Sequence, residues 1–390
     1  MTYKNDYLMD TYDFLDLTLV KGEGCYLYDS NGNKYLDFTS GIGVSSLGYG
    51  DKKLCKDLNA QISKLIHSSN IFKNETLLEV SKLLVEISEM SKVFFSNSGA
   101  ESNEGAIKLA RKYSFLNYGY GRNKVLSLKQ SFHGRTMLTL RATGQEKFHK
   151  YFFPFPEGFD YVERNNIEDF KNKVDDSVCA ILLESIQGEG GVNPLTEEFV
   201  TFISNYCEEK DILMIFDEVQ TGIGRTGKLF GFQYFNVRPD IITLAKGLGA
   251  GLPIGAVLCN EKLSNVFQKG DHGSTFGGNI LSLTGAKVVL ERMKEDDFLP
   301  SVVEKGEVLY EALKNFYSEL VIGVRGRGLM IGVEVKMPAK IVQQKALEKG
   351  LLVLTAGENV IRLLPPLVIS KEEILKGVNI LKKSIIEIGG

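Results

Sequence analysis

Short runs of apolar residues recur along the middle of the chain, and turn-forming or charged residues bound each of them. They cover residues 124–128, 179–183, 213–217 and 240–246, and a shorter run covers residues 93–95. Runs of this length with little alternation are typical of strands buried on both faces of a parallel sheet. The pattern therefore predicts an α/β protein.

Helical and hairpin patterns flank these runs. Ala106, Leu109, Ala110 and Tyr113 follow the spacing of one helix face, and Gly119 supplies a stop signal. Residues 25–38 alternate around an Asn-Gly turn and predict a β-hairpin. Residues 321–335 predict two strands, and residues 370–388 predict a helix with a capping box at its start. Near the chain end the predicted strands and helices are separated along the sequence, which predicts a smaller α+β domain.

Two of the runs end on residues that can do chemistry, Asp217 and Lys246. Ligands of open α/β sheets bind at the carboxyl ends of the strands, so both side chains are expected in one crevice. A lysine that forms a Schiff base and an acid that pairs with a pyridine nitrogen are what pyridoxal 5′-phosphate (PLP) requires. A buried salt bridge, or two unrelated strand ends, are the alternative explanations of the pair.

The residues around the pair carry a family resemblance. The segments DEVQTGIGRTGKLFGF (217–232) and PDIITLAKGLGAGLPIGA (239–256) closely resemble the class III (subgroup II) PLP-dependent aminotransferases. The other most specific parts of the match lie at residues 92–105, 132–136, 184–189 and 275–279. The resemblance covers roughly residues 10–388 of the chain, and within the family it is strongest to the acetylornithine aminotransferases.

The resemblance implies roles for individual residues. Lys246 would carry the cofactor and act as the proton-transfer base, and Asp217 would pair with the pyridine nitrogen. The implied cofactor-binding residues are Ser98, Gly99, Ala100, Phe132, His133, Glu184, Asp217, Val219, Gln220, Lys246 and Thr275. From residues alone, Ser98 and Glu101 also fit a capping box, and Phe132 fits ordinary core packing.

The family also implies the architecture. A fold-type I enzyme has a large domain with a mostly parallel, seven-stranded sheet flanked by helices, and a smaller α+β domain built from both chain ends. We place the N-terminal segment at residues 1–50, the large domain at 51–287 and the small domain at 288–390. Thr275 would reach the phosphate in the other subunit's site, which implies a homodimer with active sites at the interface.

The implied substrate-binding residues are Ile42, Arg135, Glu189 and Arg362. An arginine fork suits a carboxylate because it offers two parallel hydrogen bonds. The expected reaction transfers the distal amine of N-acetylornithine to 2-oxoglutarate and yields glutamate, as in arginine biosynthesis. Ornithine, 4-aminobutyrate and succinyldiaminopimelate remain alternative donors, and an aminomutase or a non-catalytic relative on the same fold is a further alternative.

The chain departs from the family pattern in several places. GYGDKK (48–53) replaces a turn that usually contains two histidines and a proline. Ser185 and Ile280 stand where the family has proline, and Ala100 stands where it often has threonine. At Ala100 the backbone donor is kept and one hydroxyl is lost.

Composition excludes other classes of protein. The chain has 390 residues, with 46 basic against 49 acidic residues, so no basic excess indicates nucleic-acid binding. Five dispersed cysteines without CxxC spacing indicate reduced thiols and a cytoplasmic location, and no metal site is expected. We expect neither a signal peptide nor a membrane span.

Overall fold

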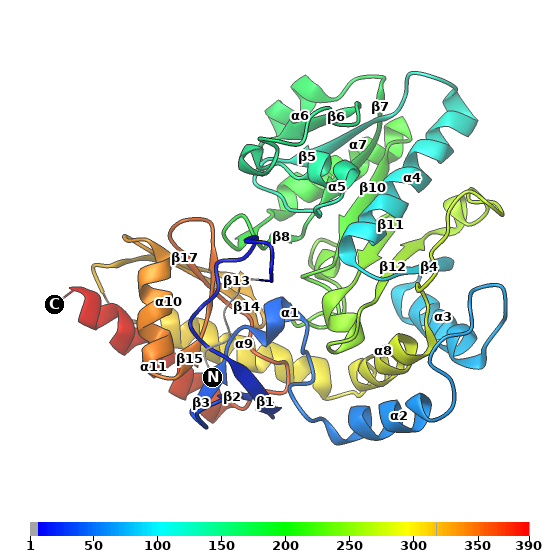
Figure 1. Cartoon of the computed structure of the whole chain (residues 1–390). Coiled ribbons are helices and arrows are strands. Elements are labelled where there is room, and N and C mark those ends of the chain that lie inside the picture. The colour runs from blue at the N-terminus through cyan, green and yellow to red at the C-terminus, as the bar shows by residue number, and fades with distance from the viewer. Residues whose placement is uncertain (1–6, 317, 390) are drawn as a thin grey trace.

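A seven-stranded sheet forms the centre of the larger part of the molecule (Figure 1). The structure is a computed structural model, and it describes residues 7–316 and 318–389. The strand order across the sheet is β4 (Lys92–Ser96), β12 (Gly255–Cys259), β11 (Ile241–Leu244), β10 (Leu213–Asp217), β7 (Val178–Leu183), β5 (Lys124–Leu128) and β6 (Phe159–Val162). The expected α/β fold is confirmed.

One strand of this sheet runs against the others. β12 is antiparallel to both of its neighbours, β11 and β4, whereas β11, β10, β7, β5 and β6 pair in parallel. A parallel neighbour requires a crossover of a dozen or more residues. The link from Leu244 to Gly255 is shorter and contains only the 3-10 turn η3 (Lys246–Gly249), so β12 turns back beside β11.

Helices cover the sheet on its two faces. The long helix α4 packs on β11, β12 and β7, α7 packs on β10, and α3 packs on β4. The helices of this part are α2 (Lys52–Ile62), α3 (Glu75–Ser88), α4 (Gly99–Tyr118), α5 (Met137–Ala142), α6 (Ile167–Lys173), α7 (Glu197–Lys210) and α8 (Ile280–Met293). Shorter elements are α1 (Ser40–Gly43), β8 (Ile186–Gln187), β9 (Asn193–Pro194), η1 (Glu146–Phe148), η2 (Gly231–Tyr234) and η4 (Glu261–Leu263).

Two small sheets form the rest of the molecule. One is antiparallel, in the order β13 (Val321–Arg327), β14 (Met330–Val335), β17 (Val360–Leu363) and β16 (Leu354–Ala356). The other joins both chain ends, with β1 (Leu19–Glu23), β2 (Tyr26–Asp29), β3 (Lys34–Asp37) and β15 (Leu351–Leu352). The helices here are α9 (Phe298–Lys314), α10 (Ala339–Glu348) and α11 (Lys371–Gly389).

The expected hairpin at residues 25–38 is the β2–β3 pair, and the expected strands at 321–335 are β13 and β14. The predicted C-terminal capping box is confirmed, because Ser370 Oγ accepts from Glu373 N at 3.1 Å and Glu373 Oε2 accepts from Ser370 N at 2.9 Å. The domain boundaries stay a prediction. Helix α8 runs through the expected boundary at residue 288, and the first six residues of the expected N-terminal segment lie outside the described part of the chain.

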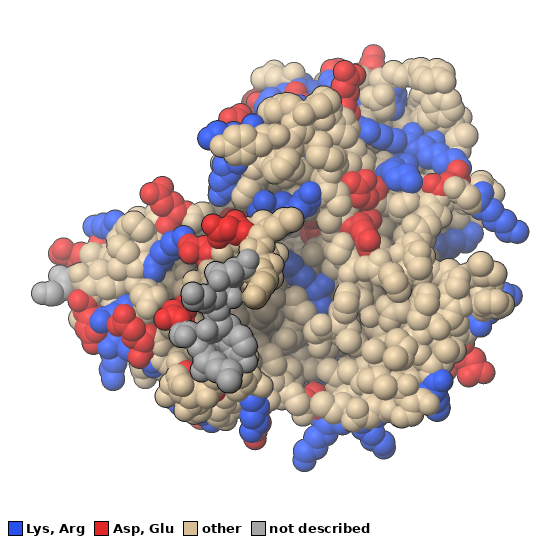
Figure 2. All heavy atoms as spheres, in the orientation of Figure 1, with Lys and Arg blue, Asp and Glu red and all other residues tan. Residues whose placement is uncertain are grey.

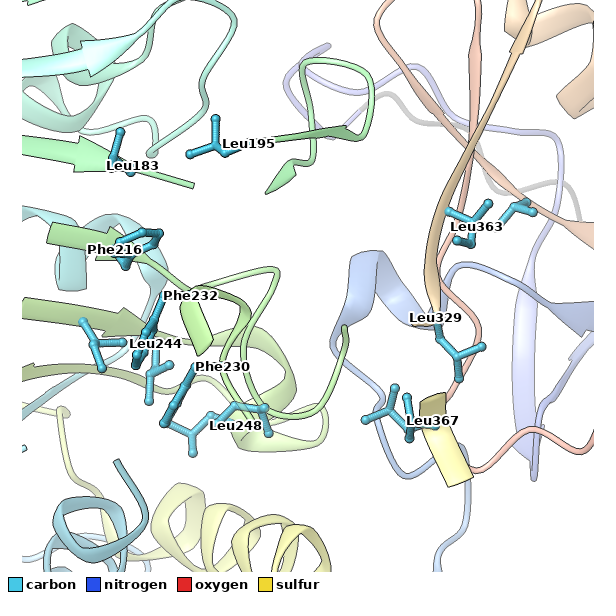
Figure 3. Packing of buried hydrophobic residues seen from close by; sticks show 14 of the residues in the cluster. Leu183, Leu195, Phe216, Phe230, Phe232, Leu244, Leu248, Leu329, Leu363 and Leu367 are labelled. Carbon is cyan, nitrogen blue, oxygen red and sulfur yellow. The ribbon is translucent and has the colours of Figure 1, made fainter. Parts of the chain in front are cut away.

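One apolar cluster connects the parts of the molecule. Figure 3 shows Phe216, Leu244 and Phe232 at the carboxyl side of the central sheet, and Leu329, Leu363 and Leu367 on the C-terminal segments facing them. All of these residues are buried in one core. In the described part of the chain no helix has the length and apolar character needed to cross a membrane.

Candidate active site

Asp217 and Lys246 come together at the carboxyl edge of the central sheet. β10 ends at Asp217, and its parallel neighbour β11 ends at Leu244, two residues before Lys246. Both side chains line one cavity of about 490 Å³. Figure 2 shows the molecule hollowed between its upper and lower parts on this face. The volume is in the range of small-molecule and cofactor sites.

Lys246 has an unusual backbone conformation. Its φ is 41°, in the left-handed region that non-glycine residues rarely adopt. Backbone strain of this kind persists where the surrounding structure fixes it, often at active sites. Burial lowers the pKa of the Lys246 amine, and the charge of Arg362 lowers it further against the opposing carboxylates of Glu189 and Asp217. A lowered pKa increases the fraction of neutral, nucleophilic amine.

Three donors fix the buried carboxylate of Asp217. Its Oδ2 atom accepts from Asn103 Nδ2 at 2.7 Å and contacts His133 Nδ1 at 2.8 Å. Its Oδ1 atom accepts from Val219 N at 3.0 Å. Thr243 Oγ1 donates to Asn103 Oδ1 at 2.7 Å and so fixes the amide orientation. The carboxylate is therefore held in one position facing the cavity.

The first turn of α4 borders the same cavity with Ser98, Gly99 and Ala100. Amides of a first helical turn have no intrahelical acceptors, and the helix dipole favours an anion there. Ser98 caps the helix, because its hydroxyl accepts from Glu101 N at 3.2 Å. The capping box that the sequence allows here is only half formed. The Glu101 carboxylate accepts from Asn97 N and not from Ser98 N, so the second hydrogen bond of the box is absent.

Gly99 is required by its neighbour Val219. A Cβ atom at Gly99 would lie 2.7 Å from Val219 Cγ1, closer than atoms approach in proteins. The absence of a side chain lets the helix end and the loop after β10 approach each other. Phe132 also lines the cavity, so two apolar side chains, Val219 and Phe132, border the space next to Asp217.

Glu184 is an acid of the cavity whose pKa is raised. Burial, together with the nearby charge of Asp217, raises its pKa from 4.5 to about 7, against the lowering effect of His133. Its Oε2 atom accepts from Phe132 N at 3.1 Å. This hydrogen bond connects the segment that carries Phe132 to the end of β7, and it can form whether Glu184 is protonated or ionised.

Glu189 and Arg362 form an ion pair at the cavity, in which Arg362 is buried and Glu189 is partly exposed. Arg362 Nη1 donates to Glu189 Oε1 at 2.6 Å and to Gln220 Oε1 at 3.1 Å. Burial raises the pKa of Glu189, but the charge of Arg362 and its hydrogen bond outweigh burial, and the net pKa is lowered. Arg362 belongs to β17 of the C-terminal sheet, whereas Gln220 follows β10.

The structure does not bring every expected residue to the cavity wall. Ile42 is 42% exposed, and Val44 lines the cavity in its place. Thr275 is exposed and does not line the cavity of its own chain. Arg362 lies behind Glu189 and Gln220. Arg135 lines the cavity at an exposed position.

Several lining residues were not expected from the sequence, most notably Asn103. A signal existed, because Asn103 lies on the helix face formed by Ala106, Ile107 and Ala110, where a polar residue needs a specific partner. Other lining residues were not expected either: Val44, Asn97, Gly134, Ala245, Gly251, Leu252, Pro253 and Ile254.

The model of the aminotransferase class-III family matches residues 8–385, and the chain belongs to this family. An acetylornithine aminotransferase of Caldanaerobacter subterraneus subsp. tengcongensis is 51% identical and covers 100% of this chain and 99% of its own length. An acetylornithine aminotransferase of Aquifex aeolicus is 48% identical, with 97% and 99% of the two chains covered.

Solved structures agree with the fold. An ornithine aminotransferase of Toxoplasma gondii, with PLP at partial occupancy in its active site, superposes with a TM-score of 0.95 at 31% identity and covers 99% of this chain and 93% of its own. The N-acetylornithine aminotransferase of Stenotrophomonas maltophilia has a TM-score of 0.84 at 33% identity, and 96% of each chain is covered. Structures of both activities therefore share this fold.

PLP is the cofactor of this family, and the donor set of the cavity fits it. Lys246 offers an amine of lowered pKa, the start of α4 offers amides for a phosphate, and Asp217 offers a fixed carboxylate for a protonated pyridine nitrogen. His133 Nε2 and Arg362 Nε are buried and have no hydrogen-bond partner among the described residues. The protein is thus a class III aminotransferase whose site has the groups that PLP needs.

Proposed function

We propose that this chain transfers the distal amino group of N2-acetylornithine to 2-oxoglutarate, giving N-acetylglutamate 5-semialdehyde and glutamate, as in arginine biosynthesis. The Glu189–Arg362 pair is the observation that carries the proposal. The relatives described above, which are acetylornithine aminotransferases at 51% and 48% identity, support the same choice of donor.

In the proposed enzyme, bound PLP would supply an acceptor for the amino group and an electron sink for the substrate carbon that bore it. Lys246 Nζ holds the cofactor and later moves the proton at that carbon. Asp217 keeps the pyridine nitrogen charged, with Asn103 and His133 holding the carboxylate in place. Ser98, Gly99 and Ala100 hold the phosphate, and Phe132, His133, Glu184, Val219 and Gln220 surround the ring.

The ion pair explains how one site accepts two substrates. Glutamate has a carboxylate on each side of the reacting carbon, whereas N-acetylornithine has one on a single side. Arg135 holds the distal carboxylate of glutamate or the carboxylate of N-acetylornithine. Arg362 holds the α-carboxylate of glutamate. When N-acetylornithine is bound, Glu189 pairs with Arg362, because an unpaired buried charge costs several kcal/mol.

A panel of amine donors tests the proposal. Glutamate formation from 2-oxoglutarate is measured with N-acetylornithine, ornithine, 4-aminobutyrate and succinyldiaminopimelate. We expect the highest kcat/KM with N-acetylornithine. A higher value with another donor would assign the chain to a sister activity, and amine migration without 2-oxoglutarate would assign it to an aminomutase.

We propose that the active unit is a homodimer in which Thr275 contributes to the partner's phosphate site. Next to the exposed Thr275 lies an apolar side chain, Phe276, which is exposed by 61%. The adjacent segment has Ile71 exposed by 86% and Phe72 by 64%, and Asn70 Nδ2 connects the two by donating to Ser274 O at 2.9 Å. Exposed apolar side chains on two connected segments are typical of an interface between subunits.

Complementation tests the composite site. We expect Lys246→Ala to be inactive, and Thr275→Glu to bind PLP weakly because a carboxylate opposes the phosphate. A mixture of refolded subunits forms dimers in which one site has both native residues, and activity should return. A mixture that stays inactive although mixed dimers form would contradict the shared site.

We propose a cytoplasmic location, supported by the free thiols. All five cysteines are unpaired, and four of them are buried. Disulfides are rare in reducing compartments. Fractionation of the producing cells tests this location, and recovery of the active protein outside the cytoplasmic fraction would contradict it.

A further inference from the structure

Arg135 lines the cavity, and it has no acidic partner in the described part of the chain. Two aromatic rings contact it instead. Its Cζ atom lies 4.1 Å from the centroid of the Phe148 ring and 5.5 Å from that of Phe132. Phe148 does not line the cavity, and nothing in the composition or motifs of the sequence indicated a role for it.

Hydrogen bonds fix the turn that carries Phe148 on both sides of this residue in the sequence. Phe148 ends the 3-10 turn η1, and its neighbours Gln145 and His149 are buried. Gln145 Nε2 donates to Ser131 O at 3.0 Å, and His149 Nε2 lies 2.8 Å from Leu140 O. The turn is therefore tied to the segment that precedes Phe132 and to helix α5.

The two rings also contact each other. Their centroids are 6.0 Å apart with an interplanar angle of 79°, an edge-to-face arrangement of the kind aromatic pairs prefer. Arg135 thus packs against two rings that support one another. The position of its guanidinium plane is coupled to Phe132, which borders the expected cofactor ring.

A ring and an acid hold an arginine in different ways. A carboxylate partner would take up the N–H donors and compete with a substrate carboxylate for them. An aromatic face attracts the cation without accepting those hydrogen bonds, so the N–H fork stays free. A carboxylate that arrives then meets a guanidinium group whose orientation is already fixed.

We propose that Phe148 is a positioning residue that holds the Arg135 guanidinium group for the substrate carboxylate. The inference rests on the proposed function, which assigns Arg135 to that carboxylate. Phe148 acts through Arg135 and touches neither substrate nor cofactor. Its contribution is confined to substrates that carry a carboxylate at the Arg135 side.

The test compares two 2-oxo acids as amine acceptors of the PLP-loaded enzyme. 2-Oxoglutarate has the distal carboxylate, and 4-methyl-2-oxopentanoate has a branched apolar group of similar shape. Phe148→Leu should raise the KM for 2-oxoglutarate by about three- to thirtyfold, in proportion to a lost cation–π contact, and leave kcat within about twofold. The kcat/KM for 4-methyl-2-oxopentanoate should stay within about twofold, because that acceptor does not use Arg135.

Matched variants separate positioning from folding. Phe148→Tyr keeps the ring and should keep the KM for 2-oxoglutarate. Tyr151→Leu removes an exposed aromatic residue of the same loop that does not contact Arg135, and it should change neither constant. Phe148→Met repeats the test if the leucine variant does not fold. An equal loss with both acceptors, or no loss with 2-oxoglutarate, would overturn the inference.

Arg135→Ala separates the positioning role of Phe148 from the substrate-binding role of Arg135. A large rise in the KM for 2-oxoglutarate with Arg135→Ala, but none with Phe148→Leu, would refute only the positioning role. An unchanged KM with Arg135→Ala would refute the role of Arg135 in the proposed function. The variant that combines Phe148→Leu with Arg135→Ala should have the same KM for 2-oxoglutarate as Arg135→Ala alone, because Phe148 acts through Arg135.

Discussion

Glu189 Oε1 lies 2.6 Å from Arg362 Nη1, so the carboxylate occupies the N–H group that binds the α-carboxylate of glutamate in the proposed function. The arginine side chain is 2% exposed and the glutamate side chain 29% exposed. The glutamate is therefore the more accessible partner, and the arginine is the buried one. This asymmetry is what a site for two differently charged substrates requires.

Removal of the acid should change substrate preference. Glu189→Ala leaves Arg362 permanently available, which favours glutamate, and leaves a buried charge unpaired when N-acetylornithine binds. We expect the ratio of kcat/KM for glutamate to that for N-acetylornithine to rise by about tenfold or more, corresponding to at least about 1.4 kcal/mol. Glu198→Ala, at an exposed position on α7, is the control. An unchanged ratio would refute the switching role of Glu189.

Asn103 should contribute to cofactor affinity through Asp217. Asn103→Leu removes one donor from the buried carboxylate, and hydrogen bonds to charged groups contribute about 1.5–3 kcal/mol each. We expect the dissociation constant for PLP, measured by fluorescence titration, to rise by about tenfold or more. Thr243→Val, which frees only the far side of the amide, should have a smaller effect in the same direction. Equal PLP affinity in all three proteins would contradict this role.

Glu184 should make stability depend on pH. Its pKa is raised from 4.5 to about 7 in the folded chain, so between these values the folded state holds a proton that the unfolded state has lost. The stabilising contribution is present below about pH 4.5 and is lost as pH rises toward about 7.

Denaturant unfolding of the cofactor-free protein and its Glu184→Gln variant measures this contribution. The variant keeps a neutral side chain, so the wild type should lose stability relative to it as pH rises, by an amount on the order of a few kcal/mol. A difference between the two proteins that is the same at both ends of the pH window would show that Glu184 has an ordinary pKa.

Ser185 should stabilise the loop after β7. Its hydroxyl donates to Glu218 Oε1 at 2.8 Å, and Glu218 also accepts from Thr221 Oγ1 at 2.7 Å and from Phe232 N at 2.8 Å. Ser185→Ala removes one donor from a buried carboxylate, at a cost of about 1–3 kcal/mol. Thermal unfolding should occur at lower temperature, and Thr221→Val should have a similar effect. An unchanged melting temperature in Ser185→Ala would contradict this account.

The sequence predicted the features that local pattern determines. The apolar runs predicted both strands and the end of β10, whereas β11 ends at Leu244, two residues before the predicted Lys246. Their parallel pairing places Asp217 and Lys246 at one edge of the sheet. The start of α4 was also predicted, because Ser98 and the apolar stripe are local signals. The roles of these residues came from the family resemblance.

Features that depend on distant contacts were not predicted. Asn103 is fixed by Thr243, which lies 140 positions later in the chain. The contact between Phe148 and Arg135 depends on how η1 folds back onto the segment before α5. No pattern of apolar residues in the sequence predicts this arrangement. The Glu101 carboxylate accepts a hydrogen bond from Asn97 N rather than from Ser98 N, and residue spacing alone does not distinguish these two amides.

A spectral half-reaction tests the central claim most directly. The purified, PLP-loaded protein is mixed with one amine donor at a time, without 2-oxoglutarate, and the absorbance of the lysine-bound cofactor is followed. The account predicts rapid conversion to the aminated cofactor by N-acetylornithine and slow conversion by ornithine and 4-aminobutyrate. Faster conversion by ornithine or 4-aminobutyrate, or no conversion by N-acetylornithine, would contradict it.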